Sequence, residues 1–290
     1  MPHGSCPGCG RARDEADEVY QLETSRGRNP WARCPHCAAY FLDGPYLLDD
    51  EVAQTETMPW GQQQAGVDLN EFKHRMFGAV VRCLEQHEPA PARVLDVGCS
   101  FGGFGIEARQ AGYDVYGMDI TPAAVEYVQS LGLEAECCST PDDVTGLPGH
   151  CVDVVTCLDC QSLWPDQPSQ LAAIHRKIRP GGLLVLRVVD KSWMFTIGRR
   201  LAPLSPTIAH RVMREAVNNN RLSMPVHTLR RQLEEQGFEI VDTSIWAAIH
   251  SDSTRWPAKL SFAFGALLWP VLRRNYAPGA LLIARSLPGR

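Results

Sequence analysis

One stretch decides the fold of this chain: Val94-Leu95-Asp96-Val97-Gly98-Cys99-Ser100-Phe101-Gly102-Gly103-Phe104-Gly105. Its pattern predicts an apolar strand, a glycine-rich turn and the start of a helix. Gly98 and Gly102 have no Cβ, so the backbone can turn sharply and a ligand can approach it at the carboxyl end of the strand. By itself such a loop fits a purely steric turn as well as a ligand loop.

On both sides of this loop, short apolar runs alternate with helical patterns, which is typical of βαβ units that form a parallel sheet. We expect strands at Val94–Gly98, Asp114–Met118, Glu134–Cys137, Val152–Leu158, Leu183–Val189, Phe238–Trp246 and Ala280–Ala284. Helices are expected at Phe104–Ala111, Pro122–Ser130, Ser169–Ile178 and Thr228–Gln236, and another, over Phe72 to Leu84, ends before Pro89. The fold class is therefore α/β, with a doubly wound, mostly parallel sheet of seven strands.

An acidic residue ends the second of these strands. Asp119 follows the glycine loop at close to the spacing of about 20 residues at which a carboxylate can accept both ribose hydroxyls. The pattern indicates a nucleoside site. A dehydrogenase would carry G-x-G-x-x-G for a diphosphate, whereas this loop has Ser100 at a position where glycine is common.

Three further motifs stand in the same order and spacing: Gly117-Met118-Asp119-Ile120, Val152-Asp153-Val154-Val155-Thr156 and Ile178-Arg179-Pro180-Gly181-Gly182-Leu183-Leu184. With the glycine loop they resemble the class I S-adenosylmethionine-dependent methyltransferases, which commonly carry V-L-D-x-G-C-G-x-G. The resemblance covers Arg93 to Arg285 and implies S-adenosylmethionine as the cofactor. The residues it assigns to cofactor binding are Asp96, Gly98, Ser100, Gly102, Asp119, Ile120, Ser139 and Asp142.

Two of these assignments carry their own expectations. We expect Ser100 to have ordinary backbone angles, because a carboxylate and a sulfonium demand less of the loop than a diphosphate does. Ser139 and Asp142 follow the third strand, where the adenine side of the site is expected, and a solvated turn is the alternative for Asp142.

The acceptor should lie beyond the carboxyl ends of the fourth and fifth strands. Many similar methyltransferases carry Glu-His just after the fourth strand, whereas this chain has Gln161-Ser162-Leu163-Trp164. The candidates at this edge are therefore Asp159, Gln161, Asp190 and His227, with His227 as the preferred base. A helix-capping or structural histidine is the alternative for His227.

Two cysteine pairs precede this domain, Cys6-Pro7-Gly8-Cys9 and Cys34-Pro35-His36-Cys37, with 24 residues between them. Two such knuckles can place four thiolates around one Zn²⁺, and the metal then supplies the folding free energy that a segment without an apolar core lacks. We expect a small hairpin between Arg11 and Pro30. Four cysteines close the coordination shell, and the acidic ribbon favours a structural brace over a nucleic-acid reader.

The domain organisation expected is a zinc ribbon at 1–45, a linker and helix at 46–92, and the methyltransferase domain at 93–290. An insertion at about 190–226 is rich in arginine, and either a lid over an anionic acceptor or an ordinary solvated helix pair fits it. The apolar segment 256–274 is too short to span a bilayer, so we expect either a buried helix or peripheral membrane contact.

Composition narrows the function further. The chain has 290 residues, a net charge of -5 and eleven cysteines, with no basic arm and no export signal at its start. We therefore expect a cytoplasmic protein with reduced thiols and no general affinity for nucleic acid. The expected acceptor is a small molecule, such as a sugar, a secondary metabolite or a carrier- or lipid-linked intermediate, methylated on oxygen. Methylation of RNA and a non-catalytic cofactor-binding role remain alternatives, and the oligomeric state stays open.

Overall fold

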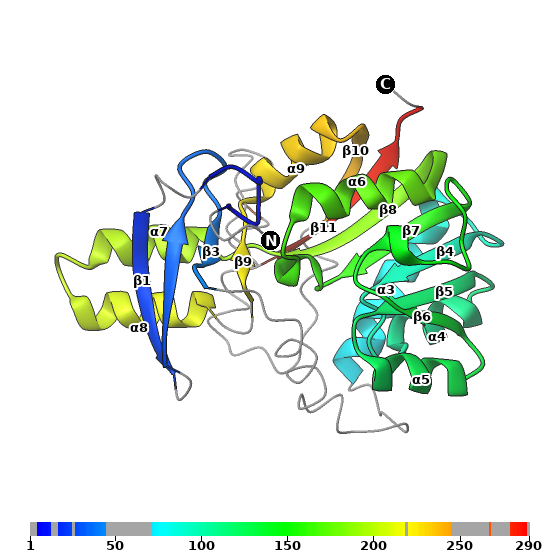
Figure 1. The fold of residues 1–290 in the computed structure, drawn as a ribbon, viewed down its shortest axis with the longest axis horizontal. Coiled ribbons are helices and arrows are strands. Elements are labelled where there is room, and N and C mark those ends of the chain that lie inside the picture. The colour runs from blue at the N-terminus through cyan, green and yellow to red at the C-terminus, as the bar shows by residue number, and fades with distance from the viewer. Residues whose placement is uncertain are drawn as a thin grey trace.

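The central element of the fold is a sheet of seven strands in the order β10-β11-β8-β7-β4-β5-β6 (Figure 1). The computed structural model describes residues 5–12, 17–24, 27–44, 71–217, 220–244, 267 and 279–288. The strand bounds are β4 Arg93–Val97, β5 Asp114–Asp119, β6 Glu134–Cys137, β7 Val152–Leu158, β8 Ile178–Val189, β10 Phe238–Ser244 and β11 Gly279–Ser286. Strands β4 to β8 pair in parallel, whereas β11 is antiparallel to both β8 and β10. The expected mostly parallel sheet is confirmed.

Helices cover both faces of this sheet, because its strands are apolar on both faces. One face packs against α3 Glu71–His87, α4 Gly103–Gln110 and α5 Pro122–Ser130, and the other against α6 Gln167–Lys177 and α9 Val226–Glu235. Neighbouring strand residues point to opposite faces, so Val94 joins the first core and Leu95 the second. This two-sided burial makes the sheet doubly wound.

Strand β8 begins five residues earlier than the expected Leu183. Ile178 already pairs with Val152, and the register shifts before Leu183 pairs with Val154. Gly182 makes this irregular pairing sterically feasible, since a Cβ there would lie 2.6 Å from the carbonyl oxygen of Asp153. The Pro-Gly-Gly turn therefore lies within the range of β8, and α6 ends at Lys177, one residue before the expected Ile178.

The N-terminal ribbon forms a second sheet in the order β1-β2-β3-β9. Strands β1 Asp17–Thr24 and β2 Gly27–Arg33 make the expected hairpin, and β3 Tyr40–Leu42 pairs with β2. The fourth strand, β9 Leu222–Ser223, comes from the insertion and pairs antiparallel with β3. Two segments far apart in sequence thus build one sheet.

The insertion itself contains two antiparallel helices, α7 Ser192–Leu201 and α8 Pro206–Val217, which lie beside the ribbon (Figure 1). Their apolar faces and the ribbon's aromatic residues form one buried cluster: Tyr20, Trp31, Tyr40, Phe195, Ala209, Met213, Ala216 and Val217. The sequence indicated that the ribbon has no apolar core of its own. The insertion supplies that core.

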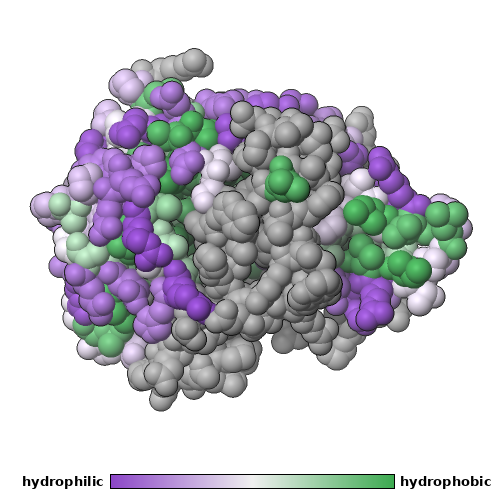
Figure 2. All heavy atoms as spheres, turned by 180° about the vertical axis from the view of Figure 1, so that it is seen from behind, coloured by the Kyte–Doolittle hydropathy of each residue, from purple (hydrophilic) through white to green (hydrophobic). Residues whose placement is uncertain are grey.

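Apolar side chains are exposed on the outer side of this helix pair. Ile197, Leu204 and Ile208 are 40%, 81% and 55% exposed, and Figure 2 shows an apolar area at the end of the molecule that α7 and α8 form. The segment 256–274 lies outside the described residues except for Leu267. Among the described helices, none is long and apolar enough to cross a membrane.

Candidate active site

The glycine loop follows β4 at the point where the strand order reverses, with β5 on one side of β4 and β7 on the other. Ligands of open α/β sheets bind at such switch points, beyond the carboxyl ends of the strands. Gly98 and Gly102 have φ of 73° and 78°, and a Cβ on Gly98 would lie 2.7 Å from that of Cys160. Position 98 therefore requires glycine for two reasons: its φ is positive, and the segment after β7 leaves no room for a Cβ.

Ser100 does not have the ordinary backbone angles expected from the sequence. Its φ is 47°, in the left-handed region that costs a residue with a Cβ about 1–2 kcal/mol. The backbone N–H of Ser100 donates to Oδ2 of Asp119 at 2.8 Å. That charge-assisted bond helps to hold the strained residue in place.

Asp119 lies at the end of β5 and is 7% exposed. Its Oδ2 accepts from Ser100, and its Oδ1 accepts from the backbone N–H of Thr121 at 2.9 Å. Each carboxylate oxygen has two lone pairs, so both keep capacity for a further donor. Asp119 is thus a fixed acceptor beside the glycine loop, with Ile120 partly exposed next to it.

Asp96 lies within β4, beneath the loop, and is 3% exposed. The hydroxyl of Thr156 donates to its Oδ1 at 2.6 Å. Burial, opposed by this hydrogen bond, raises the pKa of Asp96 to about 7. Asp96 therefore places a buried, titratable carboxyl group in the strand that precedes the loop.

Two residues, Ser139 and Asp142, were expected on the adenine side of the site. Ser139 is exposed after β6, and its carbonyl oxygen accepts from Nε2 of Gln170 at 2.9 Å. Asp142 is bound by the guanidinium of Arg176, with Nε 3.1 Å from Oδ1, and this hydrogen bond lowers its pKa. The Asp142 side chain thus has a surface partner, in agreement with the alternative of a solvated turn.

At the acceptor edge, Asp159 follows β7 with a φ of 68°. Its Oδ2 forms an ion pair with Nη1 of Arg187 on the neighbouring β8, and its backbone N–H donates to the carbonyl oxygen of Arg187 at 3.0 Å. Its Oδ1 is buried and has no hydrogen-bond partner within the described part of the chain. A buried acceptor without a donor costs about 1–3 kcal/mol, so this oxygen suits a donor on a ligand.

Sequence inspection missed Arg187. It is a guanidinium near the carboxyl end of an otherwise apolar strand, and its side chain is 14% exposed. Such a residue in a buried strand is unusual. The signal was therefore present in the run from Leu183 to Val189.

Gln161 does not lie with Asp159. It starts η2 Gln161–Leu163, is 2% exposed, and donates its Nε2 to Oε1 of Gln167. The side chain is held in a buried amide network. The geometry therefore argues against the expected catalytic role.

His227 is the exposed second residue of α9. The preceding residue, Val226, donates its backbone N–H to Oδ2 of Asp190 at 3.0 Å, and Ser192 donates its hydroxyl to Oδ1 at 2.6 Å. Asp190, at the end of β8, thus fixes the first turns of both α7 and α9. The structure places His227 next to that anchor.

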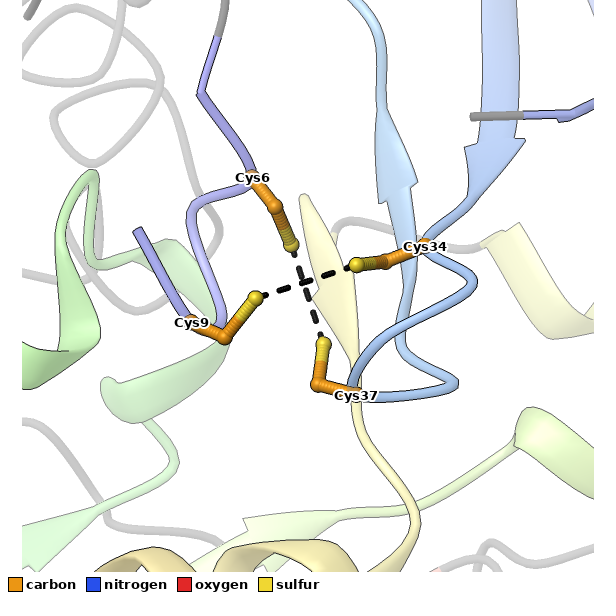
Figure 3. Close-up of side chains that lie close together, drawn as sticks. All are labelled: Cys6, Cys9, Cys34 and Cys37. Carbon is orange, nitrogen blue, oxygen red and sulfur yellow. Dashed lines mark hydrogen bonds between the residues drawn. The ribbon is translucent and has the colours of Figure 1, made fainter. Parts of the chain in front are cut away.

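The four ribbon cysteines converge on one point from two knuckles (Figure 3). The Sγ atoms of Cys6 and Cys37 are 3.8 Å apart, those of Cys9 and Cys34 are 3.7 Å apart, and all four lie within 4.8 Å of one another. A tetrahedron with Zn–S bonds of about 2.3 Å has edges of about 3.8 Å. The arrangement fits a closed four-thiolate zinc site.

Comparison with known proteins adds a family match. The family model described as "Methyltransferase domain" matches residues 69–243. Ubiquinone biosynthesis O-methyltransferase from Pseudomonas aeruginosa (strain UCBPP-PA14) is 31% identical over 117 residues, covering 37% of this chain and 50% of that protein. The protein of the same name from Alkalilimnicola ehrlichii is 28% identical over 160 residues, 51% of this chain and 64% of the relative. The chain thus spans about half the length of the first of these relatives.

Solved structures resemble the fold at low identity. Geranyl diphosphate C-methyltransferase from Streptomyces coelicolor A3(2) has a TM-score of 0.53 at 13% identity, over 84% of this chain and 99% of that chain. A TehB-like SAM-dependent methyltransferase from Corynebacterium glutamicum has a TM-score of 0.50 at 14% identity, over 81% and 99%. At these identities the likeness establishes the fold alone.

Proposed function

Because this chain belongs to the methyltransferase domain family, we propose that it transfers the methyl group of S-adenosylmethionine to an oxygen atom of a small-molecule acceptor. The observation that carries this proposal is the joint geometry of the glycine loop and Asp119. The left-handed Ser100, bonded through its N–H to Asp119, ties the loop after β4 to the acid after β5. This pair lies at the switch point of the sheet, where a nucleoside ligand is expected.

The residues proposed to hold S-adenosylmethionine differ in how they act. Asp119 would accept the ribose hydroxyls, and the backbone around Gly98, Ser100 and Gly102 would admit the amino-acid part of the cofactor. Asp96 would support the glycine loop from within β4, where the Thr156 hydroxyl donates to its carboxylate. Ile120 and Ser139 would flank the adenine, and Asp142 would contribute through its backbone because Arg176 binds its side chain.

The methyl donor supplies a sulfonium from which the methyl carbon is displaced in line: a bond forms from the acceptor oxygen as the carbon–sulfur bond breaks. The protein must align the acceptor, exclude water and receive the acceptor's proton. The buried Oδ1 of Asp159, which has no partner in the described part of the chain, would orient the acceptor hydroxyl or the cofactor's ammonium group. His227, fixed beside the end of β8, is the proposed base.

The arginine-rich insertion supports an anionic acceptor. It contributes Arg199, Arg200, Arg211, Arg214 and Arg221, whereas the charge of Arg187 is already balanced by its ion pair with Asp159. The relatives are named as O-methyltransferases of ubiquinone biosynthesis, which supports oxygen as the methylated atom. An anionic acceptor predicts methylation that weakens as salt rises.

We further propose that the four cysteines bind one structural Zn²⁺. Cys6, Cys34 and Cys37 are at most 4% exposed, and their sulfur spacing matches a tetrahedral site. Four thiolates leave no open position for a substrate. They also require a reducing compartment, which supports a cytoplasmic location. Metal analysis should find one zinc per chain, and Cys34→Ser should lose it.

Calorimetry with S-adenosylhomocysteine tests the cofactor site directly. The Asp119 carboxylate accepts hydrogen bonds from the backbone N–H groups of Ser100 and Thr121. In Asp119→Asn the side-chain NH₂ group would face one of these two donors, and that hydrogen bond would be lost. We therefore expect affinity to fall by about 10- to 100-fold. Glu126→Gln, on the same stretch of chain but in α5, serves as the control. Unchanged affinity in Asp119→Asn, or no binding by the unmodified protein, would contradict the proposal.

A screen for the acceptor completes the test. Labelled methyl transfer from S-adenosylmethionine into fractionated cell extract should mark a small, acidic molecule with an oxygen acceptor. Transfer into RNA would replace the small-molecule proposal. Cofactor binding without transfer into any fraction would favour a non-catalytic role.

A further inference from the structure

Three buried glutamines lie head to tail between the first cysteine knuckle and the segment after β7. Gln161 donates its Nε2 to Oε1 of Gln167, and Gln167 donates its Nε2 to Oε1 of Gln232. Gln232 then donates its Nε2 to the carbonyl oxygen of Gly8 at 2.7 Å. The three side chains are 2%, 0% and 8% exposed. Buried amides are costly unless hydrogen-bonded, so this arrangement is strongly preferred.

The carbonyl oxygen of Gly8 sets the direction of the whole chain of amides. It can only accept, so Gln232 must turn its NH₂ toward Gly8 and its oxygen toward Gln167. Gln167 must then turn its NH₂ toward Gln232, which leaves its oxygen for Gln161. Reversing one amide would set two oxygens or two NH₂ groups against each other. The Gly8 carbonyl therefore fixes the orientation of each amide in turn.

At the ribbon end, the chain of amides contacts the metal-binding knuckle itself. Gly8 lies between Cys6 and Cys9, and the carbonyl oxygen of Pro7 accepts from the backbone N–H of Gln167 at 2.9 Å. Met224 packs so closely on Gly8 that a Cβ there would lie 2.7 Å from its Cε. The knuckle thus cannot move without disturbing the start of α6.

At the other end, the chain of amides reaches the cofactor loop. Gln161 follows Cys160, whose Sγ donates to the carbonyl oxygen of Val97 at 3.1 Å and whose Cβ packs against Gly98. Asp159, whose Oδ1 has no hydrogen-bond partner among the described residues, precedes Cys160. A shift of Gln161 would therefore move residues that contact the glycine loop and the acceptor edge.

From this continuous contact we infer that Gln161, Gln167 and Gln232 are positioning residues that couple the metal-binding knuckle to the cofactor loop. The inference rests on the proposed function, which supplies both ligands. Zinc fixes the knuckle and hence the Gly8 carbonyl, and the amides carry that constraint to Cys160 and Gly98. Coupling between two binding sites is reciprocal, so cofactor binding must in turn stabilise the zinc site.

The test measures the zinc affinity of the full chain by equilibrium competition with the chelating dye 4-(2-pyridylazo)resorcinol, with and without saturating S-adenosylhomocysteine. In the unmodified protein the ligand should raise the zinc affinity by about fivefold or more. Gln161→Met and Gln232→Met keep the side-chain volume but remove the amide. Gln161→Met should bring the ratio of the two zinc affinities to about one. Gln232→Met should lower the ratio less, because the Pro7 carbonyl still binds the backbone N–H of Gln167. Gln129→Met, which removes an amide bonded to the Ala135 carbonyl at the far edge of the sheet, should leave the ratio unchanged.

The outcomes separate coupling from simple support of the ribbon. Gln161 is three hydrogen bonds from Gly8, so loss of the ratio in Gln161→Met, with zinc content retained, requires transmission through the amides. Binding of S-adenosylhomocysteine by calorimetry without any effect on zinc affinity would overturn the inference and leave the proposed function standing. A ratio of zinc affinities that is retained in Gln161→Met would also overturn it. If S-adenosylhomocysteine does not bind at all, the proposed function itself fails.

Discussion

The ring of Tyr40 lies nearly parallel to the ring of Phe195, with centroids 4.6 Å apart and planes at 8°. Tyr40 belongs to the ribbon and Phe195 to the inserted helix α7. Trp31 packs against the same phenylalanine, at 5.2 Å and 27°. Phe195 is completely buried, so it joins the ribbon and the helix pair through one shared core.

Phe195→Ala should therefore destabilise both parts together. Loss of a fully buried phenylalanine typically costs about 3–5 kcal/mol, because a cavity remains. Urea denaturation of the zinc-loaded protein should show this loss. Ile197→Ala, an exposed neighbour on the same helix, should change the free energy of unfolding by less than about 0.5 kcal/mol. A loss below about 1 kcal/mol in Phe195→Ala would show that the shared core contributes little.

The positive φ of Ser100 predicts that glycine at this position is more stable than alanine, the reverse of the usual order. With a φ of 47°, glycine fits this position without steric cost, whereas alanine retains the strain. Ser100→Gly should be more stable than Ser100→Ala by about 1 kcal/mol, measured by chemical denaturation. At Ser139, whose φ is not positive, alanine should be at least as stable as glycine. The same order at both positions would contradict the strain at Ser100.

The predictable part of this molecule is the part whose signals are local. The apolar run Val152–Leu158 and the glycine at Gly98 predict the strand and the turn directly, because each signal depends on neighbouring residues. The shared core was not predictable, because Tyr40 and Phe195 are far apart in sequence. No local pattern around either residue indicates contact with the other. The amide network around Gln161 was not predictable for a similar reason: Gln167 and Gln232 come from two different helices.

Asp96 predicts a specific dependence of stability on pH. Its pKa rises from 3.8 to about 7 on folding, chiefly through burial. Between these values the folded protein holds a proton that the unfolded chain has released, so raising the pH favours unfolding. The contribution is fully present below pH 3.8, declines up to about pH 7 and then stays lost. It amounts to roughly 4 kcal/mol at most, at about 1.36 kcal/mol per pH unit.

Asp96→Asn isolates this effect. Asparagine can still accept from Thr156 but cannot ionise. The variant should gain stability relative to the unmodified protein as pH rises from 5 to 8, measured by urea denaturation at each pH. Asp114→Asn, an exposed strand residue, should show no such gain. A constant difference between Asp96→Asn and the unmodified protein across this range would contradict the prediction.

His227 provides the sharpest test of the proposed chemistry. Because it is exposed, His227→Ala should fold normally, while the bond from Val226 to Asp190 keeps α9 in position. Loss of a general base typically lowers turnover by about 10²- to 10⁴-fold. Turnover on the acceptor found by the labelled screen should fall to that extent, and calorimetry should show unchanged affinity for S-adenosylhomocysteine. Arg231→Ala, one turn along α9 and also exposed, should retain full turnover. If His227→Ala is equally active, the histidine has no part in the reaction. Asp159, whose buried Oδ1 has no donor among the described residues, then becomes the residue to substitute.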